Sequence, residues 1–251
     1  MIVTGRILLA IALVLLWQWG YESSGELFFA SPISVLRRIY DVARDGSLWV
    51  HAASTIWISC FGFLIGFVAG VILPFILYQS ERATRAIEPA VMASMGIPKF
   101  ALAPLLILWF GIGDAPKVVI VAFMVFYMIF ISTFSGLRGV DRRLVVMAQI
   151  VGARHLKVAR DVLWKSLQPY LFAGLKVALP RAISATIVGE FLVADRGLGY
   201  MIEHSRQMGD TTGVFAGIVI VTAVVLGLNW LLERLQGWAL AWKPAEAGPA
   251  H

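Results

Sequence analysis

Four charged side chains interrupt long apolar runs, and these are the first residues from which chemistry would be expected. Lys99 lies in one run, whereas Lys176, Arg181 and Glu190 share another. If the runs cross a membrane, each lone charge costs about 2.5–3.5 kcal/mol, so such residues are usually paired or functional. About 21 Å of helix would separate Lys176 from Glu190, so these two cannot pair. We expect Lys176 to reach water near a helix end. We expect Lys99, Arg181 and Glu190 to line a solute path, with structural pairing or interfacial placement as the alternative.

An enzyme is the first function to test. Gly111-Ile112-Gly113-Asp114 fits the Gly-x-Gly-Asp pattern of intramembrane aspartyl proteases, which need a second aspartate inside the membrane. The remaining aspartates, at positions 41, 45, 141, 161, 195 and 210, all lie outside the apolar runs. The chain has neither His-Glu-x-x-His nor Gly-x-Ser-x-Gly, and it lacks the Gly-x-x-x-x-Gly-Lys phosphate loop. We therefore predict no catalysis and no cofactor in this chain.

The composition indicates a membrane protein. Of the 251 residues, 59% are hydrophobic and only 14% are charged, whereas soluble domains carry about 25% charged residues. The net charge of +6 could suggest nucleic acid, but the basic residues occupy short segments between apolar runs. That distribution is typical of the cytoplasmic face of a membrane protein. We expect contact with membrane lipid and no nucleic-acid binding.

The apolar runs predict six transmembrane helices in a single domain that covers residues 1–251. Their approximate bounds are 5–21, 52–78, 89–113, 118–137, 169–193 and 211–233. The first run resembles a signal peptide, but no cleavage site follows closely and its end is rich in Trp and Tyr. An aromatic end of this kind favours a retained span.

Local patterns predict how the helices begin, bend and pack. Ser31-Pro32 is typical of a helix N-terminus, and the following apolar and basic residues predict an amphipathic surface helix that ends near residue 44. The third run is predicted to be broken or kinked by Gly96, Pro98 and Pro104. The second run carries the small-xxx-small spacing of close helix packing at Gly62, Gly66 and Gly70. Glycine is also common in membrane helices without such a role.

The basic residues predict the orientation of the chain. With the amino terminus in the cytoplasm, twelve basic residues fall inside and six outside, and the amphipathic helix contributes three of those six. Basic loops remain preferentially on the cytoplasmic side. We therefore expect a cytoplasmic amino terminus.

The longest polar cytoplasmic stretch is the predicted loop 138–168. Apolar spacing predicts one short helix before Gly152 and a second one after it. Such a pair of helices could dock into a groove of a partner, or the basic loop could rest on lipid headgroups.

Several stretches resemble the binding-protein-dependent permeases of ATP-binding cassette (ABC) importers. Val146-Met147-Ala148-Gln149-Ile150-Val151-Gly152-Ala153 resembles the Glu-Ala-Ala-x-x-x-Gly loop of that family, and Pro169 with Gly174-Leu175-Lys176 resembles the entry into its fifth span. Further stretches resemble the nitrate/sulfonate/taurine subfamily, namely Ser31-Pro32, Ala103-Pro104-Leu105-Leu106-Ile107-Leu108-Trp109-Phe110-Gly111-Ile112-Gly113, Gly189-Glu190-Phe191 and Gly197-Leu198-Gly199-Tyr200. The similarity runs in order from about residue 30 to 236.

Three positions depart from the family pattern. Val146 stands where the family usually has glutamate, and Lys165 stands where a proline is frequent. Arg154 replaces the common serine after Gly-Ala, so the second short helix lacks its usual side-chain cap. The docking role is expected to remain, whereas the polar contact of the family glutamate is in doubt.

The resemblance implies an all-α type I importer permease in the bacterial inner membrane, with a cytoplasmic coupling helix between spans four and five. It implies a homodimer of permeases over two ATP-binding subunits, which would bind ATP and Mg, and a periplasmic or lipid-anchored substrate-binding protein. By this resemblance, the contact with the ATPase involves Val146, Met147, Ala148, Gly152 and Ala153. Arg154 and Lys157 would lie at its rim.

The solute is open at this point. Members of the subfamily carry nitrate, sulfonates, taurine or aromatic acids, and the basic balance with Arg181 favours a small anion. The alternative is a thiamine pyrimidine precursor or a riboflavin-like solute. A secondary transporter or channel is the alternative from another class, but the halves show no internal repeat and six spans are few for a carrier.

Overall fold

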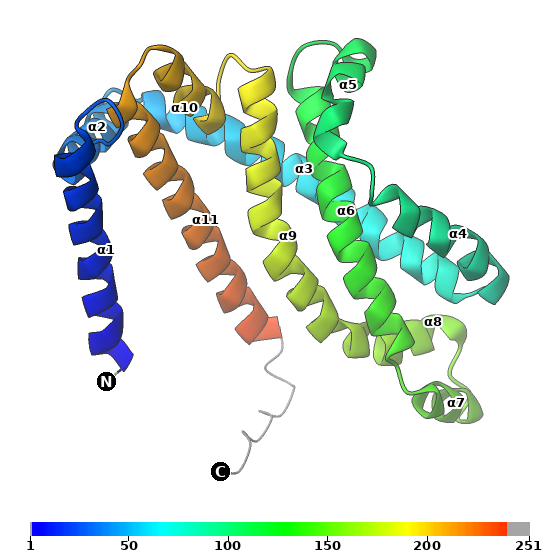
Figure 1. The fold of residues 1–251 in the computed structure, drawn as a ribbon. Coiled ribbons are helices and arrows are strands. Elements are labelled where there is room, and N and C mark those ends of the chain that lie inside the picture. The colour runs from blue at the N-terminus through cyan, green and yellow to red at the C-terminus, as the bar shows by residue number, and fades with distance from the viewer. Residues whose placement is uncertain (1, 240–251) are drawn as a thin grey trace. The chain divides into compact units, whose positions relative to one another are not determined.

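The computed structural model describes residues 2–239, without the side chains of residues 2, 3, 6, 7, 10, 142, 149, 155 and 156. Every regular element in this part of the chain is a helix, which confirms the all-α class (Figure 1). The elements are α1 (Ile2–Ser24), α2 (Pro32–Arg44), α3 (Ser47–Tyr78), α4 (Glu81–Ser94), η1 (Lys99–Leu102), α5 (Ala103–Phe110), α6 (Asp114–Arg138), α7 (Arg142–Ile150), α8 (His155–Val158), η2 (Ala159–Leu163), α9 (Trp164–Leu192), α10 (Leu198–Gln207) and α11 (Thr211–Ala239).

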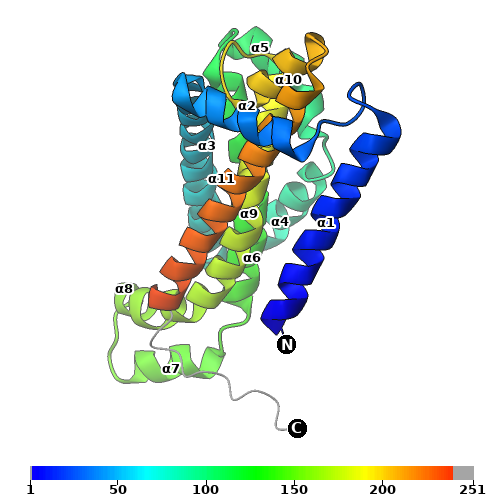
Figure 2. The same ribbon diagram turned by 90° about the vertical axis from the view of Figure 1, so that its left-hand side faces the viewer.

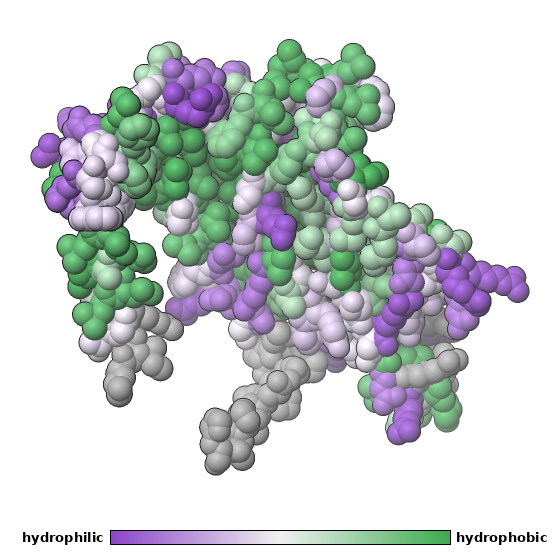
Figure 3. Space-filling view, in the orientation of Figure 1, coloured by the Kyte–Doolittle hydropathy of each residue, from purple (hydrophilic) through white to green (hydrophobic). Residues whose placement is uncertain are grey.

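Four helical stretches within the described residues are long and apolar enough to cross a membrane: α3, α6, Ala159–Leu192 and α11. They agree with four of the predicted spans. Figure 3 shows the hydrophobic side chains that α1 and α5 also expose, as expected of helices beside lipid or another apolar surface. The predicted span 5–21 lies within α1, which is not among the four, so the count of six stays a prediction.

The region of the predicted third span, 89–113, contains a break between two helices, as the sequence indicates. Glu81–Ser94 and Lys99–Phe110 form a pair of helices bent by 84°. The first of them begins eight residues before Pro89, because the side chain of Ser80 accepts the backbone N–H of Ala83 and caps α4. Pro89 therefore lies inside a helix whose first turn is polar.

The chain forms two compact units. The first comprises Met1–Ile58 and Thr186–Val224, and the second comprises Ser59–Ala185 and Val225–His251. In the first unit, Figure 2 shows α2 lying across the start of α11. The buried side chains of Ala30, Val35 and Ala216 form the small apolar core at this place. Ser31 caps α2 by accepting the backbone N–H of Ser34 over 3.1 Å, as the sequence predicts.

The core of the second unit lies between α3, α6 and α9. Gly66 of α3 packs so closely on α6 that a Cβ atom would overlap the carbonyl oxygen of Ala122. Gly62 and Gly70 also approach α6 closely, since a Cβ atom would lie 2.7 Å from Val121 and 2.9 Å from Ile129. The small-xxx-small interpretation of these glycines is therefore confirmed. Gly136 of α6 packs closely on Leu167 and Tyr170 of α9, and Gly174 of α9 packs closely on Ser132 of α6.

Candidate functional site

The segment between α6 and α9 folds as two short helices around Gly152 (Figures 1 and 2). α7 ends at Ile150, and Gly152 follows in the left-handed region with φ of +80°. The backbone N–H of Ala153 donates to the carbonyl of Ala148 over 3.0 Å. This bond is the Schellman closure of a helix C-terminus, in which glycine is the residue that adopts the left-handed position at least cost. The hinge predicted at Gly152 therefore has a local cause.

The second helix is shorter than the apolar pattern suggests. α8 covers only His155–Val158, and the π-helical turn η2 then continues directly into α9. The carbonyl of Arg154 accepts the backbone N–H of Lys157 over 2.9 Å and that of Val158 over 3.0 Å. The segment thus connects to the fifth predicted span through continuous helical backbone.

The predicted contact residues lie on an accessible surface. Met147 is 63% exposed, and Val146, Gly152, Arg154 and Lys157 are exposed as well, whereas Ala148 and Ala153 are half-buried. Leu144, Ile150 and Val151 extend the apolar surface, with exposed fractions of 48%, 78% and 84%. Contiguous apolar side chains outside the candidate spans mark an interaction surface. We call Leu144, Met147, Ile150 and Val151 the α7 apolar face.

Glu190 belongs to a buried hydrogen-bond cluster in the first unit. Its side chain is 2% exposed, and Oε1 accepts the hydroxyl proton of Thr55 over 2.8 Å. Oε2 accepts the backbone N–H of Gly199 over 2.7 Å. Thr55 Oγ1 in turn accepts the backbone N–H of Leu198 over 2.8 Å, and the Nδ1 atom of His51 accepts that of Gly197 over 3.1 Å.

We call these groups the Glu190 clasp, because three side chains hold three consecutive backbone amides at the start of α10. The first amides of a helix have no partner within the helix, and the helix dipole favours a negative charge beside them. A buried carboxylate at this end therefore satisfies donors that would otherwise be orphaned. The clasp fixes the position at which α10 begins after the end of α9.

The glycines of the sequence Gly197-Leu198-Gly199 are required by this clasp. Gly197 has φ of +122°, and a Cβ atom there would overlap the carboxyl group of Glu190. At Gly199 a Cβ atom would lie 2.6 Å from the carbonyl oxygen of Ile187 and 2.8 Å from the Cβ of Glu190. The glutamate and the two glycines are thus one structural feature.

Lys99 closes the break in the third predicted span. Its Nζ atom donates to the carbonyls of Met95 and, over 3.3 Å, Ser94 at the end of α4. It also lies 4.5 Å from the centre of the Tyr127 ring, whose hydroxyl is 2.8 Å from Ser94 Oγ. These contacts add a charged donor to carbonyls at the end of α4, of which that of Ser94 also accepts the backbone N–H of Ile97.

Arg181 differs from the other membrane charges. It is exposed on α9 next to Pro180, which does not interrupt the helix, and it makes no hydrogen bond or ion pair with any described residue. Lys176, on the same helix, lies 3.8 Å from a carboxylate oxygen of Glu233. Lys99 and Arg181 belong to the second unit and Glu190 to the first.

Comparison with known families decides the identity of the fold. Residues 62–239 match the model of the binding-protein-dependent transport system inner membrane component. The chain belongs to this family. It is therefore a permease of the ABC transporter class and a multi-pass protein of the inner membrane, as its sequence resemblance implies.

Named relatives of the permease cover nearly its whole length. It is 35% identical to the riboflavin transport system permease protein RibX of Chloroflexus aurantiacus, over 89% of this chain and 85% of the relative. It is 33% identical to the aliphatic sulfonates transport permease protein SsuC of Escherichia coli, over 94% and 91%. It is 30% identical to the formylaminopyrimidine transport permease protein ThiX of Halalkalibacterium halodurans, over 92% of each.

The relationship to sulfonate and taurine permeases confirms the nitrate/sulfonate/taurine-type subfamily. Among solved structures, the permease resembles the inward-facing MetNI methionine ABC transporter with a TM-score of 0.65 at 19% identity, over 73% of this chain and 91% of that one. At this identity the likeness shows the fold alone.

Sequence reasoning missed the two other side chains of the Glu190 clasp, of which Thr55 bonds to Glu190 itself and His51 bonds to Gly197. His51 and Thr55 are separated from the α10 amides by 146 and 143 positions. His51 precedes the charge-free apolar run 52–78, and Thr55 lies near the start of that run. No local pattern therefore marks either residue as functional. The one available signal was the pairing of Gly189-Glu190 with Gly197-Leu198-Gly199, which the resemblance to the family already singled out.

Proposed function

We propose that this permease is the membrane subunit of an ATP-driven importer, in which two copies combine with two separate ATP-binding subunits. ATP and Mg would be bound in those subunits, and a periplasmic or lipid-anchored binding protein would deliver the solute. The segment α7–Gly152–α8 would dock on the ATPase and transmit its closure to α6 and α9.

The observation that carries this proposal is the α7 apolar face. Its side chains are exposed although they lie outside the candidate spans, and the capped turn at Gly152 holds them on a defined helix end. The segment is joined to α9 by continuous helical backbone. A push on α8 would therefore reach a membrane-spanning helix without passing through a flexible linker.

Co-purification tests the docking role. Met147→Asp should reduce the amount of ATP-binding subunit that a tagged permease retains by roughly 30-fold, because hot-spot truncations typically cost about 2 kcal/mol. The matched control is Met208→Asp, since Met208 is a similarly exposed methionine (70%) at the end of α10. Equal retention by both variants would contradict the assignment of the α7 face.

We propose a cytoplasmic amino terminus from the distribution of basic residues. This orientation puts α7 and α8 in the cytoplasm and α10 on the periplasmic side. Single cysteines at Arg154 and Met208, in a chain with Cys60 replaced by serine, should react with an impermeant maleimide from opposite sides of the membrane. Labelling of position 154 from outside intact spheroplasts would reverse the orientation.

We propose a small anion as the solute, such as a sulfonate, nitrate, taurine or an aromatic acid. Arg181 supports this choice, because an exposed guanidinium in a membrane helix without a partner among the described residues needs a counter-ion. Thiamine pyrimidine precursors and riboflavin-like solutes are the second candidates, because relatives named for such solutes are as similar as the sulfonate permease.

Ligand profiling of the cognate binding protein distinguishes these solutes.

If the solute is an anion, Arg181→Gln should lower uptake while Arg181→Lys restores it. Lys176→Gln is the control on the same helix, since Lys176 already has Glu233 as a partner. Unchanged uptake in Arg181→Gln would remove Arg181 from the path.

ATP dependence tests the importer proposal. Uptake that survives ATP depletion in cells containing the permease and its binding protein would contradict it.

A further inference from the structure

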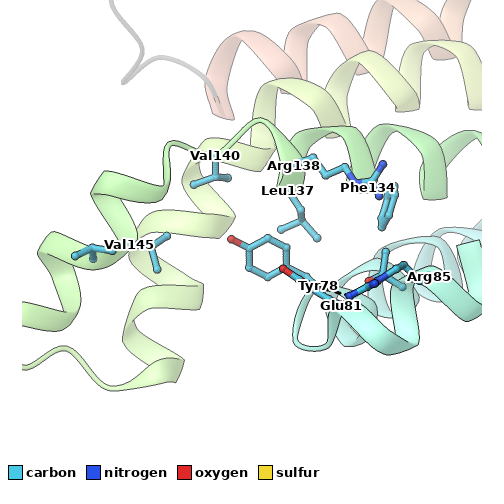
Figure 4. Close-up of a pocket in the computed structure, with 10 residues that line it drawn as sticks. Tyr78, Glu81, Arg85, Phe134, Leu137, Arg138, Val140 and Val145 are labelled. Atoms are coloured by element: carbon cyan, nitrogen blue, oxygen red, sulfur yellow. Dashed lines mark hydrogen bonds and ion pairs between the residues drawn. The ribbon is translucent and has the colours of Figure 1, made fainter.

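Two cavities in the part of the chain that the structure describes differ in the ionisable groups that line them. The larger, of about 690 Å³, lies in the second unit beside the ends of α3 and α6 (Figure 4). Its two arginines are ion-paired, because Arg138 contacts Glu88 over 2.7 Å and Arg85 contacts Glu81 over 3.4 Å. Histidine is the side chain whose ordinary pKa lies between pH 5 and 8, and none of the residues that line this cavity is a histidine.

The smaller cavity, of about 230 Å³, lies in the first unit and is lined by two histidines. It is enclosed by α2, the start of α3, α10 and the start of α11. The Tyr200 ring contacts both imidazoles, with its centre 5.8 Å from that of His51 and 5.5 Å from that of His204. The two histidines therefore share one cavity, and they differ in what their ring nitrogens bind.

His51 takes part in the Glu190 clasp as an uncharged acceptor. Its Nδ1 atom accepts the backbone N–H of Gly197 over 3.1 Å. Because an amide N–H can only donate, Nδ1 must keep its lone pair, and the proton of the neutral ring is on Nε2. A further proton therefore adds to Nδ1 itself, which is the atom that holds Gly197.

Protonation of His51 would place an N–H group against the N–H of Gly197. Gly197 is buried, so its amide would be left without an acceptor. This glycine is the residue directly before α10, and its φ of +122° sets the direction in which the helix begins. Loss of the hydrogen bond therefore releases the chain just before the other two amides of the Glu190 clasp.

The charges around His51 favour a second, protonated state. Charged and titratable groups come from each neighbouring element, namely Arg38 and Asp45 at α2, Glu190 of α9, Asp195 and Arg196 in the loop before Gly197, Tyr200 and His204 of α10, and Asp210 before α11. Arg38 and Asp210 offset each other in an ion pair of 2.7 Å. Asp45 lines the same cavity as His51, so an imidazolium formed there has a carboxylate in its surroundings.

We propose that His51 is a proton switch in the Glu190 clasp. Neutral His51 holds Gly197 and the start of α10, whereas protonated His51 releases them. The switch goes beyond the proposed transport function, because it concerns how α10 is held and not the solute or the ATPase. With the proposed orientation, it responds to the acidity of the periplasm.

Hydrogen–deuterium exchange of the full-length permease in nanodiscs tests the proposal. Exchange of the segment 193–207 is followed between pH 8 and 5, and each rate is divided by the intrinsic chemical rate at that pH. In the wild type, the corrected exchange at the start of α10 should be constant above about pH 7 and should rise roughly tenfold as the pH falls through and below about 6.5. Nanodiscs expose both faces of the permease to the same pH, so the result does not depend on the proposed orientation.

Two substitutions of His51 should abolish this pH dependence in opposite ways. His51→Asn puts an amide oxygen that does not titrate near the place of Nδ1, so exchange should stay slow at every pH. His51→Ala removes the acceptor, so exchange should be fast at every pH. His204→Asn is the matched control and should keep the wild-type rise, because the His204 ring contacts Tyr200 but holds no backbone amide among the described residues.

Three outcomes would overturn the proposal. The wild type could show no rise in corrected exchange at low pH. The rise could persist in His51→Asn or in His51→Ala, which would assign the response to another group, first of all the buried carboxylate of Glu190. The rise could disappear in His204→Asn, which would make the other histidine of the cavity the switch.

Discussion

The Glu190 clasp and the α7–Gly152–α8 segment both depend on a glycine in the left-handed region, but for opposite reasons. At Gly197 a side chain would collide with a buried carboxylate, whereas the space around Gly152 is open. The first glycine is required by tertiary packing and the second by local backbone geometry alone. The clasp thus belongs to the rigid interior of its unit, and the α7–α8 segment presents its apolar face outward.

Substitution of Gly197 is expected to have the largest effect. Gly197→Ala places a Cβ atom into Glu190 and adds backbone strain of about 1–2 kcal/mol, so the clasp cannot close. We expect a loss of folded permease well beyond that strain, measured as a lower midpoint of thermal unfolding in detergent. A midpoint within a degree of the wild type would mean that the clasp does not limit stability.

Removal of the carboxylate tests the polar half of the clasp. Glu190→Ala should cost about 1–3 kcal/mol for each buried amide or hydroxyl left without an acceptor. Glu190→Gln keeps one carbonyl oxygen and should cost less. The same unfolding measurement checks the order of the two variants. Equal costs for the two variants would show that the charge of Glu190, which both remove, matters more than its hydrogen bonds.

Gly152→Ala tests whether docking of the ATP-binding subunit can be weakened without lowering the stability of the permease. The open surroundings leave only the backbone strain, about 1 kcal/mol, so the unfolding midpoint should change little. Retention of the ATP-binding subunit should nevertheless fall, because the strain is relieved by reorienting α7 relative to α8. If this variant unfolds as readily as Gly197→Ala, the contrast between the two glycines is wrong.

The smallest effect is expected on the surface of α10. Arg206 and Gln207 donate hydrogen bonds to Glu203 and hold its pKa down at about 2. A lowered carboxylate pKa contributes stability above the ordinary value near 4.5, and that contribution is lost only as the pH falls toward 2. Between pH 5 and 8, the unfolding midpoints of Glu203→Gln and wild type should therefore run parallel. A pH-dependent difference in this range would contradict the assignment.

Much of the fold was predictable because its causes are local. Apolar runs indicated four spans, one of them despite three internal charges, and Ser31-Pro32 determined the start of α2. The start of α4 at Glu81 was not predicted, because apolar length alone does not reveal that Ser80 caps a polar first turn. The extension of the fifth span through η2 was missed for a similar reason, since a π-helical turn has no apolar periodicity of its own.

The features of the candidate site were also predictable only where their causes are local. The exposure of Met147 and the turn at Gly152 follow from a helix of this composition ending at a glycine. The sequence marked Lys99 and Glu190 as charges inside apolar runs, but their partners could not be predicted, and their role in a solute path stays a prediction. The carbonyls that Lys99 satisfies exist only because α4 ends at a bend, and Thr55 reaches Glu190 from a distant helix.

The sequence by itself determined that this protein lies in a membrane and where most of its helices run, because transfer of apolar side chains out of water depends on run length and composition. It also determined the hinge at Gly152, because a left-handed residue costs least where no Cβ atom is present. Only the tertiary structure decided which of the charged side chains in the apolar runs have hydrogen-bond partners. Glu190 holds buried amides and Lys99 holds carbonyls, while Arg181 has no partner among the described residues, since partners for a charge are set by distances between segments far apart in the chain.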